Sequence, residues 1–138
     1  MSEQIPAEVL QTVRACVAES LARPLDEITP EARLLDDLDA DSLDFVDIVF
    51  MLEERLDIKM RESELAFVTK LDWSSPEVMK DGHLTRAVVD QVNDWIPGFP
   101  AHGNPDAATA RDLFSAITIE VIARVAARRL SAKAAEGA

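Results

Sequence analysis

Residues 34–56 read LLDDLDADSLDFVDIVFMLEERL, an acidic loop followed by a strongly apolar run. Asp41 is well suited to cap a helix that begins at Ser42, because its side chain can accept a hydrogen bond from a free backbone N–H group of the first turn. A serine in that turn points its hydroxyl into solvent, and the positive end of the helix dipole favours a phosphate there. The stretch therefore predicts a helix over 42–56 whose first hydroxyl can react in the active site of another protein.

The helix predicted over 42–56 is more apolar than one buried face requires. Nine of its 15 residues are apolar, whereas a helix at the surface of a globular protein usually keeps a single apolar stripe. Some of these side chains must therefore face solvent, a partner or a ligand, unless the helix is central and buried on several sides. The pattern alone leaves both interpretations open.

The rest of the chain also favours an all-α protein, because Gly is rare and Ala, Leu, Glu and Asp are abundant. Prolines and acidic residues over 22–41 argue against a continuous helix there. Residues 57–82 are weakly patterned, and a short helix is expected near 62–68. Apolar residues at helical spacing predict three further helices, over 6–21, over 84–96, and from a cap at Asp106 or Thr109 to about residue 130.

The net charge of −12 is unevenly distributed along the chain. Residues 1–95 carry 22 acidic and nine basic side chains, whereas residues 96–138 carry four and five. Such an acidic domain repels nucleic acid and anionic membranes and attracts proteins with basic patches. The start of the chain does not resemble a secretory signal, and the longest apolar run, 48–52, is too short to span a bilayer. The expected location is the cytoplasm.

No metal site and no catalytic group are predicted. His83 and His102 stand apart from any ligand-spaced cluster, and the acidic loop lacks the Gly and Glu that a calcium loop of the EF-hand type places in register. A hydrolase that used Ser42 would need a nearby base, and the surrounding sequence offers only carboxylates. The single cysteine, Cys16, lies on the apolar stripe of the first helix, which indicates a buried structural thiol.

The acidic loop, the Asp41-Ser42-Leu43 motif and the helix after it resemble the acyl carrier protein family over residues 28–60, and Ser42 onward is most similar to specialised carriers of the AcpXL type. The resemblance implies an acyl-carrier-like four-helix bundle, here with an additional C-terminal helix. It implies that a phosphopantetheinyl transferase attaches 4′-phosphopantetheine from coenzyme A to Ser42, with Asp41 and Leu43 beside it. Acyl chains would be held on that arm as thioesters, and the chain would be a monomeric carrier, not an enzyme.

On this interpretation the apolar surplus of the 42–56 helix forms one wall of an acyl pocket. Each buried CH₂ contributes about 0.8 kcal/mol, so an acyl chain should prefer the interior. The predicted pocket residues are Phe45, Val46, Val49, Phe50 and Leu52. An acidic face with one exposed apolar anchor would meet basic docking patches on acyl-chain synthases and acyltransferases. The predicted partner-binding residues are Leu43, Asp44, Asp47, Glu53 and Glu54.

Pro and Gly residues over 97–105 predict the end of the acidic domain. The expected division is a carrier domain over 1–97, a linker over 98–109, a helical extension over 110–131 and a frayed tail over 132–138. The extension has three interpretations. It packs back on the bundle and enlarges the core or covers the acyl chain, it docks a dedicated acyltransferase or synthase, or it lies on a membrane.

The predicted function is to carry acyl chains, including very long or hydroxylated fatty acyl chains, for fatty acid or lipid A biosynthesis. Two alternatives keep the modified serine: a polyketide carrier, and a carrier of aminoacyl or peptidyl groups in a biosynthetic cluster. A third alternative is an interaction protein that keeps the carrier fold without the modification.

Overall fold

The computed structural model describes residues 5–60, 71–100 and 102–136. Within these ranges strand pairing is limited to one two-stranded hairpin and one isolated bridge, so the all-α prediction is confirmed. The short helix predicted near 62–68 lies outside the described residues. The elements, in chain order, are α1 (Ala7–Leu21), η1 (Leu25–Glu27), α2 (Ser42–Leu56), β1 (Met79–Lys80), β2 (His83–Leu84), α4 (Arg86–Trp95), η3 (Pro105–Ala107), α5 (Ala110–Ser115) and α6 (Ile119–Glu136).

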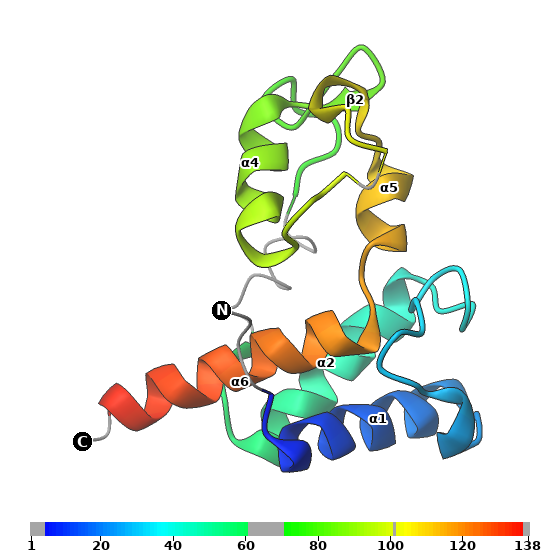
Figure 1. Ribbon diagram of the computed structural model, residues 1–138, viewed down its shortest axis with the longest axis vertical. Helices are drawn as coiled ribbons and strands as arrows, with labels where there is room; N and C mark the ends of the chain where they lie inside the picture. Colours follow the sequence, from blue (N-terminus) through cyan, green and yellow to red (C-terminus); the bar gives the residue numbers. More distant parts are fainter. Residues whose placement is uncertain (1–4, 61–70, 101, 137–138) are drawn as a thin grey trace.

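Helix α1 packs against both α2 and α6, and it lies below them in Figure 1. The three helices share one hydrophobic core, in which each fully buried aliphatic side chain contributes about 1.5–3 kcal/mol. The fully or nearly fully buried members from these helices are Val9, Val13, Cys16 and Val17 of α1, Phe45, Ile48, Val49 and Leu52 of α2, and Ile119, Val121, Ile122, Ala123, Val125 and Ala126 of α6. Cys16 is therefore buried, as predicted.

Polar contacts at the surface join the same helices. Ser20 of α1 donates a hydrogen bond of 2.9 Å to the carboxylate of Asp47 on α2. Arg55 of α2 forms an ion pair with Glu19 of α1. The C-terminal helix α6 thus belongs to the bundle through its core residues, and the first of the three interpretations of the C-terminal extension, packing on the bundle, is the one observed.

The last predicted helix differs from the structure in two ways. It is divided into α5 and α6 rather than continuous from about residue 109 to 130, and α6 remains helical to Glu136, where a frayed tail over 132–138 was expected. The division has a physical cause, because backbone groups of residues 117–120 pair with the 30–34 loop instead of continuing the helix. Thr118 then supports the start of α6, since its hydroxyl accepts a hydrogen bond of 3.2 Å from the Val121 backbone N–H.

The hairpin of β1 and β2 was not predicted. Its strands are antiparallel and pair Met79 with Leu84 and Lys80 with His83. Asp81 and Gly82 form the turn, with φ of 55° and 83°. Two consecutive residues with positive φ match the right-handed twist of a hairpin, and an Asp-Gly pair adopts them readily.

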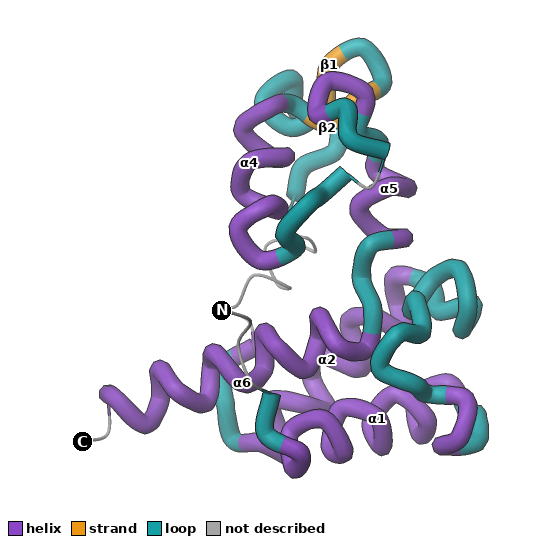
Figure 2. Tube along the Cα trace, in the orientation of Figure 1, coloured by secondary structure: helices purple, strands orange, loops and turns teal. Residues whose placement is uncertain are grey.

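The predicted 84–96 helix is confirmed as α4, which begins two residues later and ends one residue earlier than expected. It buries Val88, Val89, Val92 and Trp95 and packs against η3. Figure 2 shows α4 and the hairpin together in one region, apart from α1, α2 and α6. The helix that packs on α1 beside α2 is consequently α6, although the sequence pattern assigned α4 to the carrier bundle.

No helix among the described residues combines the length and the apolar content that a membrane crossing requires.

Candidate functional site

Ser42 is the first residue of α2, and the preceding residue, Asp41, is the N-cap of this helix. The Asp41 carboxylate accepts a hydrogen bond of 2.8 Å from the Asp44 backbone N–H, and the Asp44 carboxylate accepts one of 3.0 Å from the Asp41 backbone N–H. This reciprocal pair is a capping box, with Asp at both positions. It fixes the direction in which the loop enters the helix and confirms the predicted cap. The residue that follows the cap is therefore held at the positive end of the α2 dipole.

The surface around this helix start is acidic, with one large apolar side chain. Leu43 is 78% exposed, as expected for an apolar anchor between charges. Among the other predicted partner-binding residues, Asp47 and Glu54 are exposed and Asp44 and Glu53 are partly buried. Asp44 takes part in the capping box and Asp47 accepts the hydrogen bond from Ser20, so these two carboxylates also have structural contacts.

The loop before α2 is held in place from two sides. Within the loop, the Arg33 backbone N–H donates to the Asp37 carboxylate over 2.8 Å. Across the molecule, the Leu34 N–H donates to the Ile117 carbonyl over 3.0 Å, and the Ile119 N–H donates to the Ala32 carbonyl over 3.0 Å. The approach to Ser42 is therefore fixed partly by residues more than 70 positions later in the chain.

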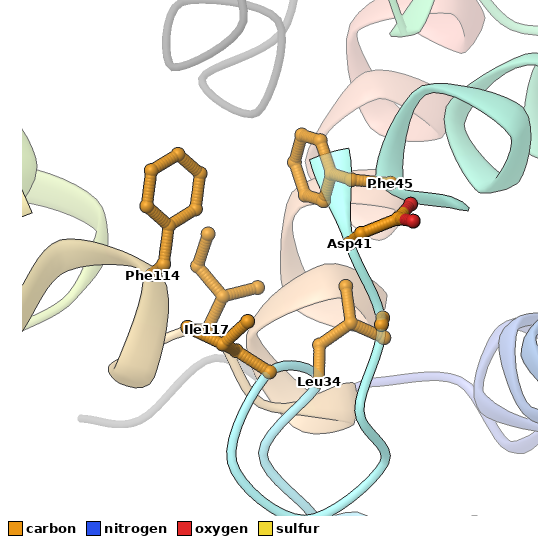
Figure 3. Close-up of a pocket in the computed structure, with 7 residues that line it drawn as sticks. Leu34, Asp41, Phe45, Phe114 and Ile117 are labelled. Atoms are coloured by element: carbon orange, nitrogen blue, oxygen red, sulfur yellow. The ribbon is translucent and has the colours of Figure 1, made fainter. Parts of the chain in front are cut away.

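An apolar cavity of about 120 Å³ lies beside the start of α2. Figure 3 shows Phe45 and Phe114 facing this space from different helices, with Leu34 and Ile117 between them, and Asp41 at the edge. Its lining residues are Leu34, Leu35, Ala40, Asp41, Phe45, Phe114 and Ile117. Apart from Asp41, every lining side chain among the described residues is apolar, so the cavity suits a hydrocarbon group rather than a polar one.

The cavity overlaps only partly with the predicted acyl pocket. Phe45 lines it, whereas Val46, Val49, Phe50 and Leu52 do not. Val49 and Leu52 are buried in the bundle core, and Phe50 is 52% exposed on another face of α2. The predicted acyl pocket and this cavity therefore coincide only at Phe45, because an apolar run on more than one helix face does not indicate which face borders an empty space.

Sequence reasoning missed the other side of the cavity. Leu34 and Leu35 had a signal, since apolar residues in an acidic loop are expected to lie against a core. Phe114 and Ile117 had none, because their position follows from the pairing of residues 117–120 with the loop. Phe114 lies on α5, which has its own capping box of Thr109 and Asp112.

The surroundings of two ionisable groups away from α2's first turn shift their pKa values. Burial raises the pKa of the Cys16 thiol, an effect that Arg55 only partly offsets, so this cysteine is held neutral. Burial tends to raise the pKa of Asp112, but hydrogen bonds from Thr109 and His102 outweigh that effect and lower it. Over residues 5–60, 71–100 and 102–136, no three acidic, His or Cys side chains gather as metal ligands.

A family model described as "Phosphopantetheine attachment site" matches residues 11–72, a range that contains most of α1 and all of the acidic loop and α2. An acyl carrier protein of Borreliella burgdorferi is 42% identical over 57 residues, which cover 41% of this chain and 71% of the relative. An acyl carrier protein of Helicobacter hepaticus is 40% identical over 57 residues, 41% of this chain and 75% of the relative.

A third relative, an acyl carrier protein of Thermosynechococcus vestitus, is 38% identical over 58 residues, 42% of this chain and 72% of the relative. No solved structure matches the chain significantly. The matched family segment ends before the hairpin, α4, α5 and α6 begin. With a capped α2 that starts at a serine, an apolar cavity beside it and relatives aligned over more than two thirds of their length, this chain belongs to the acyl carrier protein family, whose members carry 4′-phosphopantetheine.

Proposed function

We propose that Ser42 is the residue to which 4′-phosphopantetheine is attached, and that the chain carries fatty acyl groups for fatty acid or lipid A biosynthesis. The observation that carries the proposal is the position of Ser42. It is the first residue of α2, directly after a complete capping box, within the matched segment and adjacent to a residue that lines an apolar cavity.

The chemistry of this helix start fits the group. A phosphodiester on Ser42 would lie at the N-terminus of a 15-residue helix, where free N–H groups and the dipole favour negative charge. The carboxylate of Asp41, the residue before Ser42, accepts a hydrogen bond from the Asp44 backbone N–H. When bound, the group supplies a thiol on a flexible arm, on which an acyl chain is held as a thioester.

The surface around the arm fits proteins with basic docking patches, as expected for a phosphopantetheinyl transferase and for acyl-chain synthases and acyltransferases. The chain has a net charge of −12, and Leu43 is exposed beside the proposed attachment residue. Electrostatic attraction of this kind raises association rates and weakens with salt, while a central apolar side chain contributes affinity. We propose that the carrier acts as a monomer in the cytoplasm.

Incubation with coenzyme A and a broad-specificity phosphopantetheinyl transferase, followed by intact mass measurement, tests the attachment. We expect the protein to gain the mass of one arm, and Ser42→Ala to gain none. Ser74→Ala is the matched control, since Ser74 is an exposed serine in a loop away from α2, and it should gain one arm like the wild type. An arm on Ser42→Ala, or no arm on the wild-type protein, contradicts the proposal.

The cargo is tested separately. Protein purified from its own source is digested, and the mass attached to the Ser42 peptide is measured. A fatty acyl group, hydroxylated or not, supports the proposed pathway, whereas an aminoacyl or polyketide group would assign the carrier to a different biosynthetic system.

A further inference from the structure

The described residues that line the cavity beside Ser42 come from two segments that are far apart in the sequence. The first comprises the acidic loop and the start of α2, and it contributes Leu34, Leu35, Ala40, Asp41 and Phe45. The second is the junction of α5 and α6, and it contributes Phe114 and Ile117. The second segment lies beyond the family match, which ends at residue 72.

The second segment is fixed against the first by backbone hydrogen bonds. The Leu34 N–H donates to the Ile117 carbonyl, the Ile119 N–H to the Ala32 carbonyl, and the Glu120 N–H to the Pro30 carbonyl, over 2.9–3.0 Å. Ile117 itself is only 1% exposed. This part of the wall therefore cannot withdraw without breaking the pairing that separates α5 from α6.

Phe114 is less buried than most of the apolar residues in the wall. It is only partly buried, whereas Leu34, Phe45 and Ile117 are buried. Its ring packs at a tilt against Trp73, with the ring centroids 5.9 Å apart. An aromatic pair of this kind contributes about 0.5–1.5 kcal/mol beyond the area that it buries. Apart from this ring contact, Phe114 gives up less buried surface when it moves than Leu34, Phe45 or Ile117 would.

We propose that an acyl chain tethered through Ser42 enters this cavity and that Phe114 sets the length of chain that is admitted. The inference rests on the proposed attachment at Ser42. A tether keeps the chain at high effective concentration beside the cavity mouth, where Asp41 is both a lining residue and the direct neighbour of Ser42. The apolar lining matches hydrocarbon, and each methylene that enters is removed from water.

The size of the cavity limits what enters while Phe114 stays in place. A dry cavity of about 150 Å³ accommodates benzene, so about 120 Å³ corresponds to roughly five carbon atoms. A longer chain must displace the Phe114 ring. Replacing Phe114 with Ala removes the six ring carbons from the wall, which extends the available space to roughly ten carbon atoms if the wall does not collapse.

The experiment compares the wild-type protein with Phe114→Ala, each loaded by the transferase with arms that carry acyl chains of 4 to 14 carbons. Intact mass confirms loading, and the readout is the rise in melting temperature relative to the unacylated arm on the same protein. For the wild type we expect the rise to level off near five carbons. For Phe114→Ala we expect it to continue to about ten.

Phe50→Ala is the matched control, because it removes the same atoms from a phenyl group that is 52% exposed and lies outside the cavity lining. It should level off where the wild type does. The inference is overturned if Phe114→Ala levels off with the wild type, or if Phe50→Ala shifts the limit instead. Absence of loading on the wild-type protein would contradict the attachment at Ser42, a result distinct from both.

A second readout needs no destabilising variant. Loading the wild-type protein with a 12-carbon chain should displace Phe114 from Trp73 and change the tryptophan emission. The change should be lost in Trp73→Phe, which leaves only the buried Trp95. Should Phe114→Ala fail to fold, Phe114→Leu and this emission change decide the question, and an unchanged emission together with an unshifted limit in Phe114→Leu overturns the inference.

Discussion

Two segments of this molecule, residues 30–56 and residues 109–136, are built in similar ways but give very different signals in the sequence. Each has a capping box at the start of a helix, formed by Asp41 and Asp44 in the first and by Thr109 and Asp112 in the second. Each also places fully buried aliphatic side chains in the shared core. The first segment contains the motif that identifies the family, whereas the second lies outside the matched range.

The difference shows that the family motif indicates where the modified residue lies, but not how much of the chain belongs to the fold. The modified residue of a carrier needs a helix cap, a helix start and an acidic surface close together. Neighbouring residues in the sequence provide all three, so a short motif is enough to indicate them. The core that supports this arrangement is assembled from distant residues, and here α6 packs on α1. The C-terminal segment is therefore part of the bundle and not an appendage to it.

The largest effect should come from shortening a fully buried core side chain in either segment. Leu52 on α2 and Ile122 on α6 are both 0% exposed. We expect Leu52→Ala and Ile122→Ala each to lower the free energy of unfolding by about 2–5 kcal/mol, as for other large-to-small changes in a core. Chemical denaturation followed by circular dichroism measures both.

Leu25→Ala is the control for this pair, because Leu25 is 43% exposed and its loss should change the free energy of unfolding by less than about 0.5 kcal/mol. If Ile122→Ala behaves like this control while Leu52→Ala does not, α6 does not share the core of α2, and the comparison fails.

The sequence predicts the first segment well because its signals are contiguous. The helix over 42–56 is confirmed with the same bounds as α2, since a cap, an acidic first turn and an apolar run follow one another. The break between α5 and α6 could not be predicted in this way. Leu113, Ile117 and Val121 continue the helical spacing across it, and only the pairing with the 30–34 loop interrupts the helix.

The residues that line the cavity also differ in how well the sequence predicts them. Phe45 could be predicted because it follows Ser42 by three residues on an apolar helix. Phe50 does not line this cavity, and spacing could not show this, because the apolar run of α2 covers several helix faces. Phe114 depends on tertiary structure alone. The hairpin differs from both. Asp81-Gly82 is a local turn signal, but its two strands have only two residues each, too few for a strand pattern to be recognised in the sequence.

A smaller effect should come from the two capping boxes, one in each segment. Asp41→Ala and Thr109→Ala each remove a side chain that accepts a backbone N–H, over 2.8 Å and 3.1 Å. We expect each to lower the free energy of unfolding by about 1 kcal/mol. Thermal denaturation of the two variants measures this, with Asp41→Asn as a control that keeps a capping side chain. A loss at Asp41 with none at Thr109 would mean that α5 forms independently of its cap.

The smallest effect should come from the contact that joins the end of α2 to α6. Lys133 on α6 donates to both the carboxylate and the backbone carbonyl of Asp57, over 2.6 Å each. The hydrogen bond and the charge of Lys133 lower the pKa of Asp57 below its ordinary value. A carboxylate with a lowered pKa in the folded state stabilises the protein above the unfolded pKa of about 3.9, and this contribution is lost as the pH falls through the folded value.

Asp57→Asn isolates that contribution. Asn tolerates the left-handed conformation that Asp57 adopts at the end of α2, with φ of 52°, and it leaves the backbone carbonyl available to Lys133. We expect the variant to melt at a slightly lower temperature than the wild type at pH 6 in low salt. The difference should disappear when the pH falls below the folded pKa of Asp57, and it should shrink in high salt because the side chain is exposed. No difference at pH 6 would show that the backbone hydrogen bond, which both proteins keep, and not the charge, holds α6 to the end of α2. A difference that persists at both low pH and high salt would contradict an electrostatic cause.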